Sequence, residues 1–348
     1  MATYTATLAA ALPSIGFRAE MLAARPRLSR RLRWLTAAWP GPHPTRATPP
    51  GREAADVFRI AQVHFDLYGK PLALAGRQLP DLMHWTYPLP LRMRGRPNLY
   101  TVHDLIPLFH PALTGIDAPR FRRILQAVLR QADGIVTVSE ATKQDLVRHL
   151  GMDPARIVNT GQAVDVSSAV DPMVPGLEPN RYWLHVGAVE RRKNLPRLVE
   201  AWKASGTSHP LVIAGPDGWM AAELDTTHAG LHRIPWLDRP RLLGLIRDAR
   251  ALLMPSLAEG FGLPVAEAMA LGTPVLTSRT GALAEVAGSA AMLIDPEDTA
   301  EMTAGLRTLD NDEPLRTRLS AQGHDQARNF TPAAYATRLA ALYAKYLK

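Results

Sequence analysis

Two glutamates, Glu259 and Glu267, flank a glycine-rich turn and are separated by seven residues. Gly260 and Gly262 lack a Cβ and so permit tight backbone turns, and Pro264 suits the first position of a helix. Free N–H groups at such a helix start bind anions. The segment therefore predicts an anion-binding turn between two hydrogen-bond acceptors, with Glu267 on the first turn of the helix. The alternative is that both glutamates are structural, because the helix dipole alone favours Glu in a first turn.

A cluster of three cations, Arg191–Lys193, follows an apolar strand predicted over residues 182–187. The strand ends at Gly187, and the apolar spacing after the cluster predicts a helix from Leu195. Arg binds phosphate through its planar fork and Lys binds it as a compact charge, so three cations at a strand-to-helix turn suit a diphosphate. The alternative is a solvated loop that is basic without a ligand.

Strands alternate with helices along the chain, which predicts parallel sheets with ligand sites at the carboxyl ends of the strands. In the first half the sequence predicts strands at 82–85, 98–103 and 134–139, and helices near 117–131 and 140–150. In the second half it predicts strands at 182–187, 211–214, 231–236, 251–254, 274–277 and 291–294. The proline-rich stretch 171–180 between the halves predicts a linker.

Composition agrees with two soluble-type domains and excludes several classes of protein. The 348 residues suffice for two domains, and a hydrophobic fraction of 47% can supply two cores. No run approaches the about 18 apolar residues of a membrane-spanning helix, and no signal-peptide pattern opens the chain. The absence of Cys excludes disulfides, thiol catalysis and cysteine metal sites. Together these features predict a cytoplasmic protein.

The chain is basic, with 40 Lys and Arg against 32 Asp and Glu, a net charge of +8 and a pI near 10.0. Part of the excess lies in a segment of alternating basic and apolar residues near the N-terminus. Its arginines are Arg18, Arg25, Arg27, Arg30, Arg31 and Arg33. This pattern predicts peripheral contact with an anionic membrane, the alternative being a solvated helix face. No base-reading or stacking motif accompanies the charge, so nucleic acid is not a predicted partner.

The order of these motifs resembles the retaining glycosyltransferases of family 4, which have the GT-B fold. The matching parts are the strand ending at Gly187 with its basic cluster, the turn Ala214–Gly218, and the segment from Glu259 to Glu267. Two first-half segments, 102–108 and 135–146, resemble the family's N-terminal signatures. The form His-Asp-Leu-Ile-Pro-Leu is similar to the bacterial mannosyltransferase-like branch. The resemblance covers most of the chain.

This resemblance implies an α/β protein with two Rossmann-like, doubly wound parallel-sheet domains facing a cleft. The expected boundaries are 1–172 for an N-terminal acceptor-side domain, 173–331 for a C-terminal donor-binding domain, and 332–348 for a helix packing back on the first domain. Family members have an N-terminal strand and a glycine-rich loop before the first helix. Here residues 1–12 already resemble that helix, so either the start is placed too late or the strand and loop have been lost.

The resemblance also implies roles for particular residues. Arg192 and Lys193 would stabilise the charge that develops on a nucleoside diphosphate leaving group, in place of a metal. Glu259 would face the donor sugar, Glu267 would accept hydrogen bonds from the ribose, and His103 would meet the sugar from across the cleft. Without the resemblance, His103 would be an ordinary hydrogen-bonded residue at a strand end. The other expected donor-binding residues are Arg191, Gly187, Gly215, Gly260, Phe261, Gly262 and Leu263.

No metal and no cofactor is expected. The one Asp-x-Asp match, Asp310–Asp312, predicts a polar loop and a helix start rather than a metal site. The favoured function is transfer of a hexose, mannose from GDP-mannose, to a glycan or polyprenyl-linked saccharide in polysaccharide synthesis. The alternatives are a nucleotide-sugar epimerase or hydrolase of the same fold, and a truncated, non-catalytic nucleotide-binding homologue.

Overall fold

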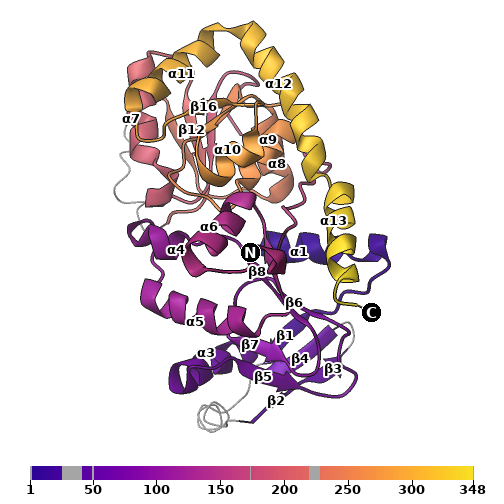
Figure 1. Cartoon of the computed structure of the whole chain (residues 1–348). Coiled ribbons are helices and arrows are strands. Elements are labelled where there is room, and N and C mark those ends of the chain that lie inside the picture. The colour runs from indigo at the N-terminus through magenta and orange to yellow at the C-terminus, as the bar shows by residue number, and fades with distance from the viewer. Residues whose placement is uncertain (1, 26–40, 49–50, 173, 219–227, 348) are drawn as a thin grey trace.

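The structure is a computed structural model that describes residues 2–25, 41–48, 51–172, 174–218 and 228–347. It consists of two α/β domains, the first below the second in Figure 1, with a C-terminal helix that extends alongside both. The fold prediction is therefore confirmed at the level of two parallel-sheet domains.

The second domain is built on a six-stranded, fully parallel sheet in the order β13-β12-β11-β14-β15-β16. Its strands are β11 (Trp183–Val186), β12 (Leu211–Ala214), β13 (Leu231–Ile234), β14 (Ala251–Met254), β15 (Val275–Ser278) and β16 (Met292–Ile294). All six predicted strands are present. The direction of the strand order reverses between β11 and β14, and in doubly wound sheets ligands bind at the carboxyl ends of the strands at such a point.

Helices cover this sheet, and aspartates cap several of them. They are α7 (Leu195–Ser205), α8 (Arg239–Arg247), α9 (Leu263–Ala270), α10 (Gly281–Ala287), α11 (Thr299–Asn311) and α12 (Glu313–Ala327), with 3₁₀ turns η4 (Arg191–Lys193) and η6 (Arg328–Phe330). Asp298 accepts a hydrogen bond from Glu301 N at the start of α11, and Asp312 accepts one from Leu315 N at the start of α12. Capping of this kind satisfies N–H groups that have no partner within the helix. Asp312 therefore begins a helix, as predicted, but the predicted loop is wrong for Asp310 and Asn311, which form the end of α11.

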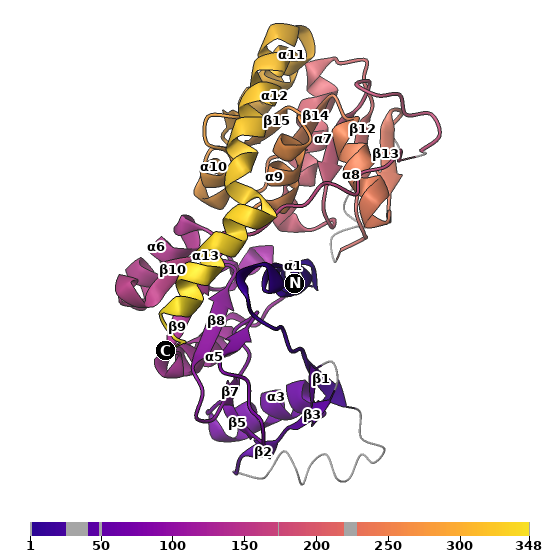
Figure 2. The ribbon, with the colours of Figure 1, turned by 90° about the vertical axis from the view of Figure 1, so that its right-hand side faces the viewer.

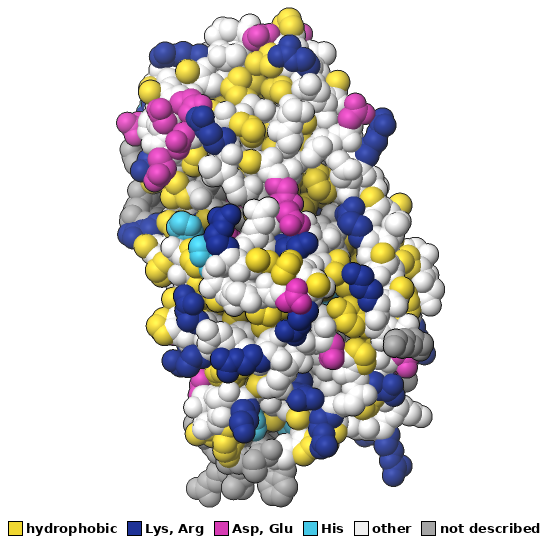
Figure 3. Space-filling view, viewed as in Figure 1, with side chains coloured by type: hydrophobic (Ala, Val, Ile, Leu, Met, Phe, Trp, Pro, Cys, Tyr) yellow, Lys and Arg dark blue, Asp and Glu magenta, His cyan; other side chains and the backbone are white. Residues whose placement is uncertain are grey.

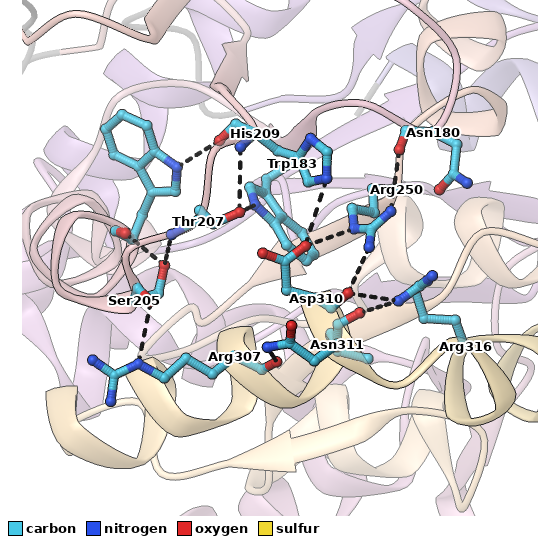
Figure 4. A network of polar contacts seen from close by, with 12 residues as sticks. Asn180, Trp183, Ser205, Thr207, His209, Arg250, Arg307, Asp310, Asn311 and Arg316 are labelled. Carbon is cyan, nitrogen blue, oxygen red and sulfur yellow. Dashed lines mark hydrogen bonds and ion pairs between the residues drawn. The ribbon is translucent and has the colours of Figure 1, made fainter.

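A polar network closes the opposite, amino-terminal edge of the same sheet (Figure 4). The Arg250 guanidinium lies 5.8 Å from the centroid of the Trp183 ring and its Nε is 3.0 Å from Asp310 Oδ1. His209 Nε2 lies 3.6 Å from the same carboxylate oxygen, and Trp183 Nε1 donates to Thr207 Oγ1 at 3.2 Å. Asp310 thus connects the end of α11 to the sheet at the edge opposite the carboxyl ends of the strands.

The described part of the first domain contains three smaller sheets. A parallel sheet has the order β10-β9-β8-β6, a second parallel sheet the order β2-β5-β7, and in the third β4 pairs with β1 in parallel and with β3 antiparallel. The strands are β1 (Leu22–Arg25), β2 (His43–Pro44), β3 (Arg46–Thr48), β4 (Gly51–Ala55), β5 (Leu72–Ala75), β6 (Met83–Trp85), β7 (Leu91–Met93), β8 (Asn98–Val102), β9 (Gly134–Thr137) and β10 (Ile157–Asn159). The helices are α1 (Ala2–Ala11), α3 (Val57–Tyr68), α4 (Ile106–Phe109), α5 (Ala118–Gln131) and α6 (Glu140–Leu150), with turns η1 (Pro13–Ile15), η2 (Pro111–Leu113) and η3 (Pro154–Arg156).

The sequence predicted β6, β8, β9, α5 and α6, but it missed the other strands of this domain and the helices α3 and α4. The arginine-rich segment starts at Arg18, before β1, and its residues 22–25 pair with β4 as a strand and do not form a helix. Its remaining part, residues 26–40, lies outside the described residues. The membrane-contact prediction therefore stays a prediction.

The last helix, α13 (Pro332–Ala344), leaves the second domain and packs against α1 in the first (Figure 2). His84 on β6 joins the two helices, because its Nδ1 lies 2.8 Å from Tyr343 Oη and its Nε2 lies 2.8 Å from Thr101 Oγ1. Thr101 Oγ1 in turn lies 3.1 Å from Tyr4 Oη on α1. Burial lowers the pKa of His84 to about 3, so this imidazole is neutral at physiological pH.

One buried apolar cluster continues from the first domain into the second. It includes Leu8 on α1, Val136 on β9, Leu184 on β11 and Leu339 on α13. Apolar burial on this scale is the main favourable contribution to folding. The two domains and α13 are consequently stabilised together and not as independent units.

Candidate functional site

Three of the predicted site residues meet where β11 and β14 end. Lys193 Nζ lies 2.6 Å from Glu259 Oε1, and Arg192 Nη1 lies 2.5 Å from Glu259 Oε2. Arg192 Nε also donates to Glu190 Oε2 at 3.0 Å. Only 7% of the Lys193 side chain and 10% of the Glu259 side chain are exposed. The strand order therefore brings Arg192, Lys193 and Glu259 together, as a buried ion-pair cluster at the point where ligands bind in such sheets.

Charge within this cluster controls its protonation. Burial raises the pKa of the Glu259 carboxyl, but Lys193 and Arg192 outweigh burial and lower that pKa to about 2. Burial lowers the pKa of Lys193, and Glu259 opposes that change. Burial also disfavours the charged Arg192, yet Glu259 and Glu190 together raise its pKa. Glu259 is thus a carboxylate at neutral pH and fixes the position of two cations.

Asn194 holds this arrangement in place, a role that the sequence did not reveal. Its backbone has φ of +59°, and its buried amide Nδ2 donates to Pro255 O at 3.2 Å and to Pro296 O at 2.6 Å. The start of α7 is therefore tied to the loops that follow β14 and β16. The available signal was an Asn directly before a helix, since Asn tolerates the left-handed conformation better than most residues.

The loops after β11 and β12 approach each other closely because Gly215 has no side chain. A Cβ at Gly215, where φ is +149°, would lie 2.2 Å from Gly187 O. Asp217 in the same turn is 2.8 Å from Arg233 Nη2 on β13. Gly187 itself lies next to the Lys193 side chain, because a Cβ there would be 2.9 Å from Lys193 Cε. Gly187 and Gly215 are therefore structural neighbours of the cation cluster, and their contact with a donor stays a prediction.

The turn after Glu259 touches the first domain at His103. A Cβ at Gly260 would lie 2.4 Å from His103 O, so only glycine permits this approach. The His103 ring packs edge-on against Tyr4, with centroids 4.8 Å apart, and its Nε2 donates to Thr86 O at 2.9 Å. Burial lowers the pKa of His103, although the Thr86 carbonyl opposes that change. A neutral imidazole therefore lies across the domain boundary from the cluster.

The neighbouring Asp104 also faces the cluster and was not among the predicted site residues. Burial raises the pKa of its carboxyl, while the charge of Arg192 opposes that change. Its Oδ1 accepts a hydrogen bond from Ile106 N at 3.0 Å. Asp104 adds a carboxyl group from the first domain to the surroundings of Arg192 and Glu259.

Glu267 lies in the second turn of α9, so its predicted place in the first turn is wrong. The helix begins at Leu263, after the left-handed cap residue Gly262, and its first turn holds no acidic residue. The Glu267 side chain is 2% exposed, and its Oε1 accepts a hydrogen bond from Arg239 Nη2 at 2.7 Å. Arg239 comes from the start of α8, and nothing in the sequence pattern pointed to this pair. A ribose hydroxyl at Glu267 would have to share the carboxylate with Arg239.

Phe261, Leu263 and Arg191 were also predicted to bind the donor. Phe261 is buried and packs edge-on against Phe330, with ring centroids 5.4 Å apart, so its side chain fills the core. Leu263 is the first residue of α9, and Arg191 is an exposed residue at the start of η4. Among the described residues, no group of three or more His, Asp or Glu side chains is placed to hold a metal ion. No helix in the described parts of the chain has the length and apolar character needed to cross a bilayer.

A sheet with Rossmann strand order, a cation cluster at its switch point and a second parallel-sheet domain facing that cluster define a glycosyltransferase of the GT-B fold. The family model "Glycosyltransferase Family 4" matches residues 1–168, and the model "Glycosyl transferases group 1" matches residues 174–326. The chain belongs to glycosyltransferase family 4, whose members transfer a sugar from a nucleotide sugar.

Individual relatives are distant. The O-antigen chain mannosyltransferase B of Escherichia coli is 30% identical in an alignment of 256 positions that covers 66% of this chain and 66% of the relative. The D-inositol 3-phosphate glycosyltransferase of Corynebacterium efficiens is 29% identical over 316 residues, covering 82% of this chain and 73% of the relative. The solved sucrose-phosphate synthase of Thermosynechococcus elongatus has a TM-score of 0.73 at 19% identity, over 99% of this chain and 92% of that structure. The last comparison concerns the fold alone.

Proposed function

We propose that this enzyme transfers mannose from GDP-mannose to a glycan or a polyprenyl-linked saccharide in polysaccharide synthesis. The observation that carries the transferase chemistry is the buried Arg192–Glu259–Lys193 cluster at the end of β11 and β14. The choice of mannose is supported by the name of the Escherichia coli relative and by the His103–Leu108 segment.

The cluster supports a direct chemical role for its two cations. When the bond between the sugar C1 and the diphosphate oxygen breaks, its electron pair moves to the diphosphate. Lys193 and Arg192 would stabilise that charge, with help from Arg191 and from the backbone N–H groups after Glu259. Glu259 would keep both cations oriented and present its outer face to the sugar. Preorganised charge of this kind requires no rearrangement at the moment of reaction.

The other two predicted residues would orient the substrate. Glu267 would bind the ribose hydroxyls in exchange for part of its contact with Arg239. His103 would meet the donor sugar from the first domain, with its Nε2–H held by Thr86 O and its Nδ1 left as an acceptor. The two domains would thus hold opposite sides of the donor.

The charge distribution supports an anionic acceptor on the first domain. Residues 1–172 contain 21 Lys and Arg against 13 Asp and Glu, whereas residues 173–348 contain 19 of each. Figure 3 shows Lys and Arg side chains spread over the first domain, with few Asp and Glu among them on this face. A phosphate-bearing polyprenyl carrier at an anionic membrane surface suits such a domain. A cytoplasmic, peripheral location is part of the same proposal.

Calorimetric titration with GDP, UDP and ADP, followed by turnover assays with their mannose and glucose conjugates, tests this function. We expect GDP to bind most tightly, and mannose to move from GDP-mannose to a polyprenyl-diphosphate saccharide. Preference for UDP or ADP would overturn the donor assignment. Consumption of the donor without any acceptor would instead favour the epimerase or hydrolase, and binding without turnover would favour a non-catalytic homologue.

A further inference from the structure

Glu285, on α10 of the second domain, caps a helix of the first domain. Its Oε1 accepts a hydrogen bond from Glu140 N at 2.7 Å, and its Oε2 accepts one from Ala141 N at 3.0 Å. These N–H groups belong to the first turn of α6, where a helix lacks internal acceptors and carries a partial positive charge. A carboxylate with one oxygen on each N–H group is therefore a strong, directional contact between the domains.

The helix that Glu285 caps also supports His103. Ser139 Oγ accepts from Thr142 N inside α6, and Thr142 Oγ1 donates to His103 O at 3.1 Å. That carbonyl oxygen is the atom against which Gly260 packs. A continuous series of contacts thus leads from Glu285 through α6 to the loop of His103, and from there to the turn that follows Glu259.

Local structure does not explain the placement of Glu285. The residue is exposed, and such a glutamate on a helix surface normally points into water. Here its two oxygens face another domain, and Asn159 Nδ2 on β10 approaches Oε1 at 3.5 Å as a third donor. Three donors from two first-domain segments converge on one carboxylate.

We propose that Glu285 is a positioning residue that fixes the spacing between the two domains and thereby places His103 against the Glu259 turn. It acts through α6 and does not touch the donor. The proposal rests on the glycosyltransferase chemistry of the family and is independent of which nucleotide sugar is used.

Kinetics of Glu285→Ala and Glu285→Gln form the first test, with Glu297→Gln as the matched control. Glu297 is an exposed carboxylate of the same domain and lies in the loop between β16 and α11. We expect kcat/KM for transfer to fall about 10- to 100-fold in Glu285→Ala, because small errors in the position of reacting groups have effects of this size. Glu285→Gln should lie between, since its amide keeps one acceptor oxygen but places an NH₂ donor against the second N–H. Binding of the free nucleoside diphosphate should change less than twofold, because its proposed contacts lie in the second domain.

A distance measurement supplies a second test that needs no substrate. The chain contains no Cys, so spin labels at Arg122→Cys on α5 and Arg318→Cys on α12 would be the only labels present. Both positions are exposed, one in each domain. We expect Glu285→Ala to broaden the distance distribution between the labels and Glu297→Gln to leave it unchanged. An unaltered distribution with kcat/KM within twofold of the control would overturn the proposal. An equal loss of nucleotide binding and turnover would also overturn it, because it would mean that Glu285 supports only the fold of its own domain.

Discussion

Replacing Glu259 by glutamine removes the charge that holds Arg192 and Lys193 while keeping the shape of the side chain. In the folded protein burial opposes ionisation of Glu259, but the two cations prevail and its pKa falls from 4.5 to about 2. The difference between these pKa values corresponds to about 3 kcal/mol of folding stability at neutral pH. Because the folded-state pKa is the lower one, this stability is present above pH 4.5 and is lost as the pH falls toward 2.

Urea unfolding of the wild type and Glu259→Gln at pH 7 and pH 3 measures this contribution. At pH 7 we expect the variant to be less stable by about 3 kcal/mol, because the neutral amide, like a protonated Glu259, leaves the two buried cations without their counter-charge. At pH 3 the pH-dependent part should shrink to about 1.4 kcal/mol, because Glu259 of the unfolded chain is then almost fully protonated while the folded protein still holds it mostly ionised. Glu297→Gln should show no comparable change between the two pH values. A difference between wild type and Glu259→Gln that is equal at pH 7 and pH 3 would refute the ion-pair reasoning.

Further predictions concern the proposed donor site. Lys193→Ala should lower kcat by about 100-fold, which is the usual effect of losing one transition-state contact. Glu267→Ala should mainly weaken nucleotide binding, as measured by calorimetry. Wild-type rates for both variants would contradict the assigned site. Gly260→Ala should lower turnover at least tenfold, because its Cβ would meet His103 O at 2.4 Å. Gly115→Ala, which meets no atom within 4 Å, should be neutral in the same assay. Turnover should persist in EDTA, since two side-chain cations would face the diphosphate in the proposed site; loss of activity that Mg²⁺ restores would disprove this.

The sequence predicted the second domain well because its strands are buried on both faces. Such strands appear as short continuous apolar runs, and those at Leu211–Ala214 and Ala251–Met254 were located to the residue. The strands β1 and β4 of the first domain have the sequences Leu-Ala-Ala-Arg and Gly-Arg-Glu-Ala-Ala, without an apolar run or alternation. Their pairing is decided by neighbouring segments, which local patterns do not describe.

The candidate site was likewise predictable only in part. The cluster of Arg192, Lys193 and Glu259 was predictable because strand ends at a switch point converge, and the order of the motifs indicated which strands those were. The contacts of Glu267 with Arg239 and of Glu285 with α6 depend on how helices pack. Glu140 and Glu285 lie 145 positions apart, and no spacing rule connects them. Glu267 was predicted in the first turn and lies in the second, because the helix begins before Pro264. An error of this size is within the usual uncertainty of helix boundaries.

The packing of α13 on α1 has a consequence for biosynthesis. Ribosomes make the chain from its N-terminus, and domains generally begin to fold in that order. His84 acquires its partner Tyr343 only after 259 further residues have been added. Until then the apolar face of α1 that includes Leu8 lacks the cover that Leu339 and its neighbours provide. The domain that is synthesised first is therefore completed last, and a nascent or prematurely terminated chain presents an uncovered apolar surface to chaperones and proteases.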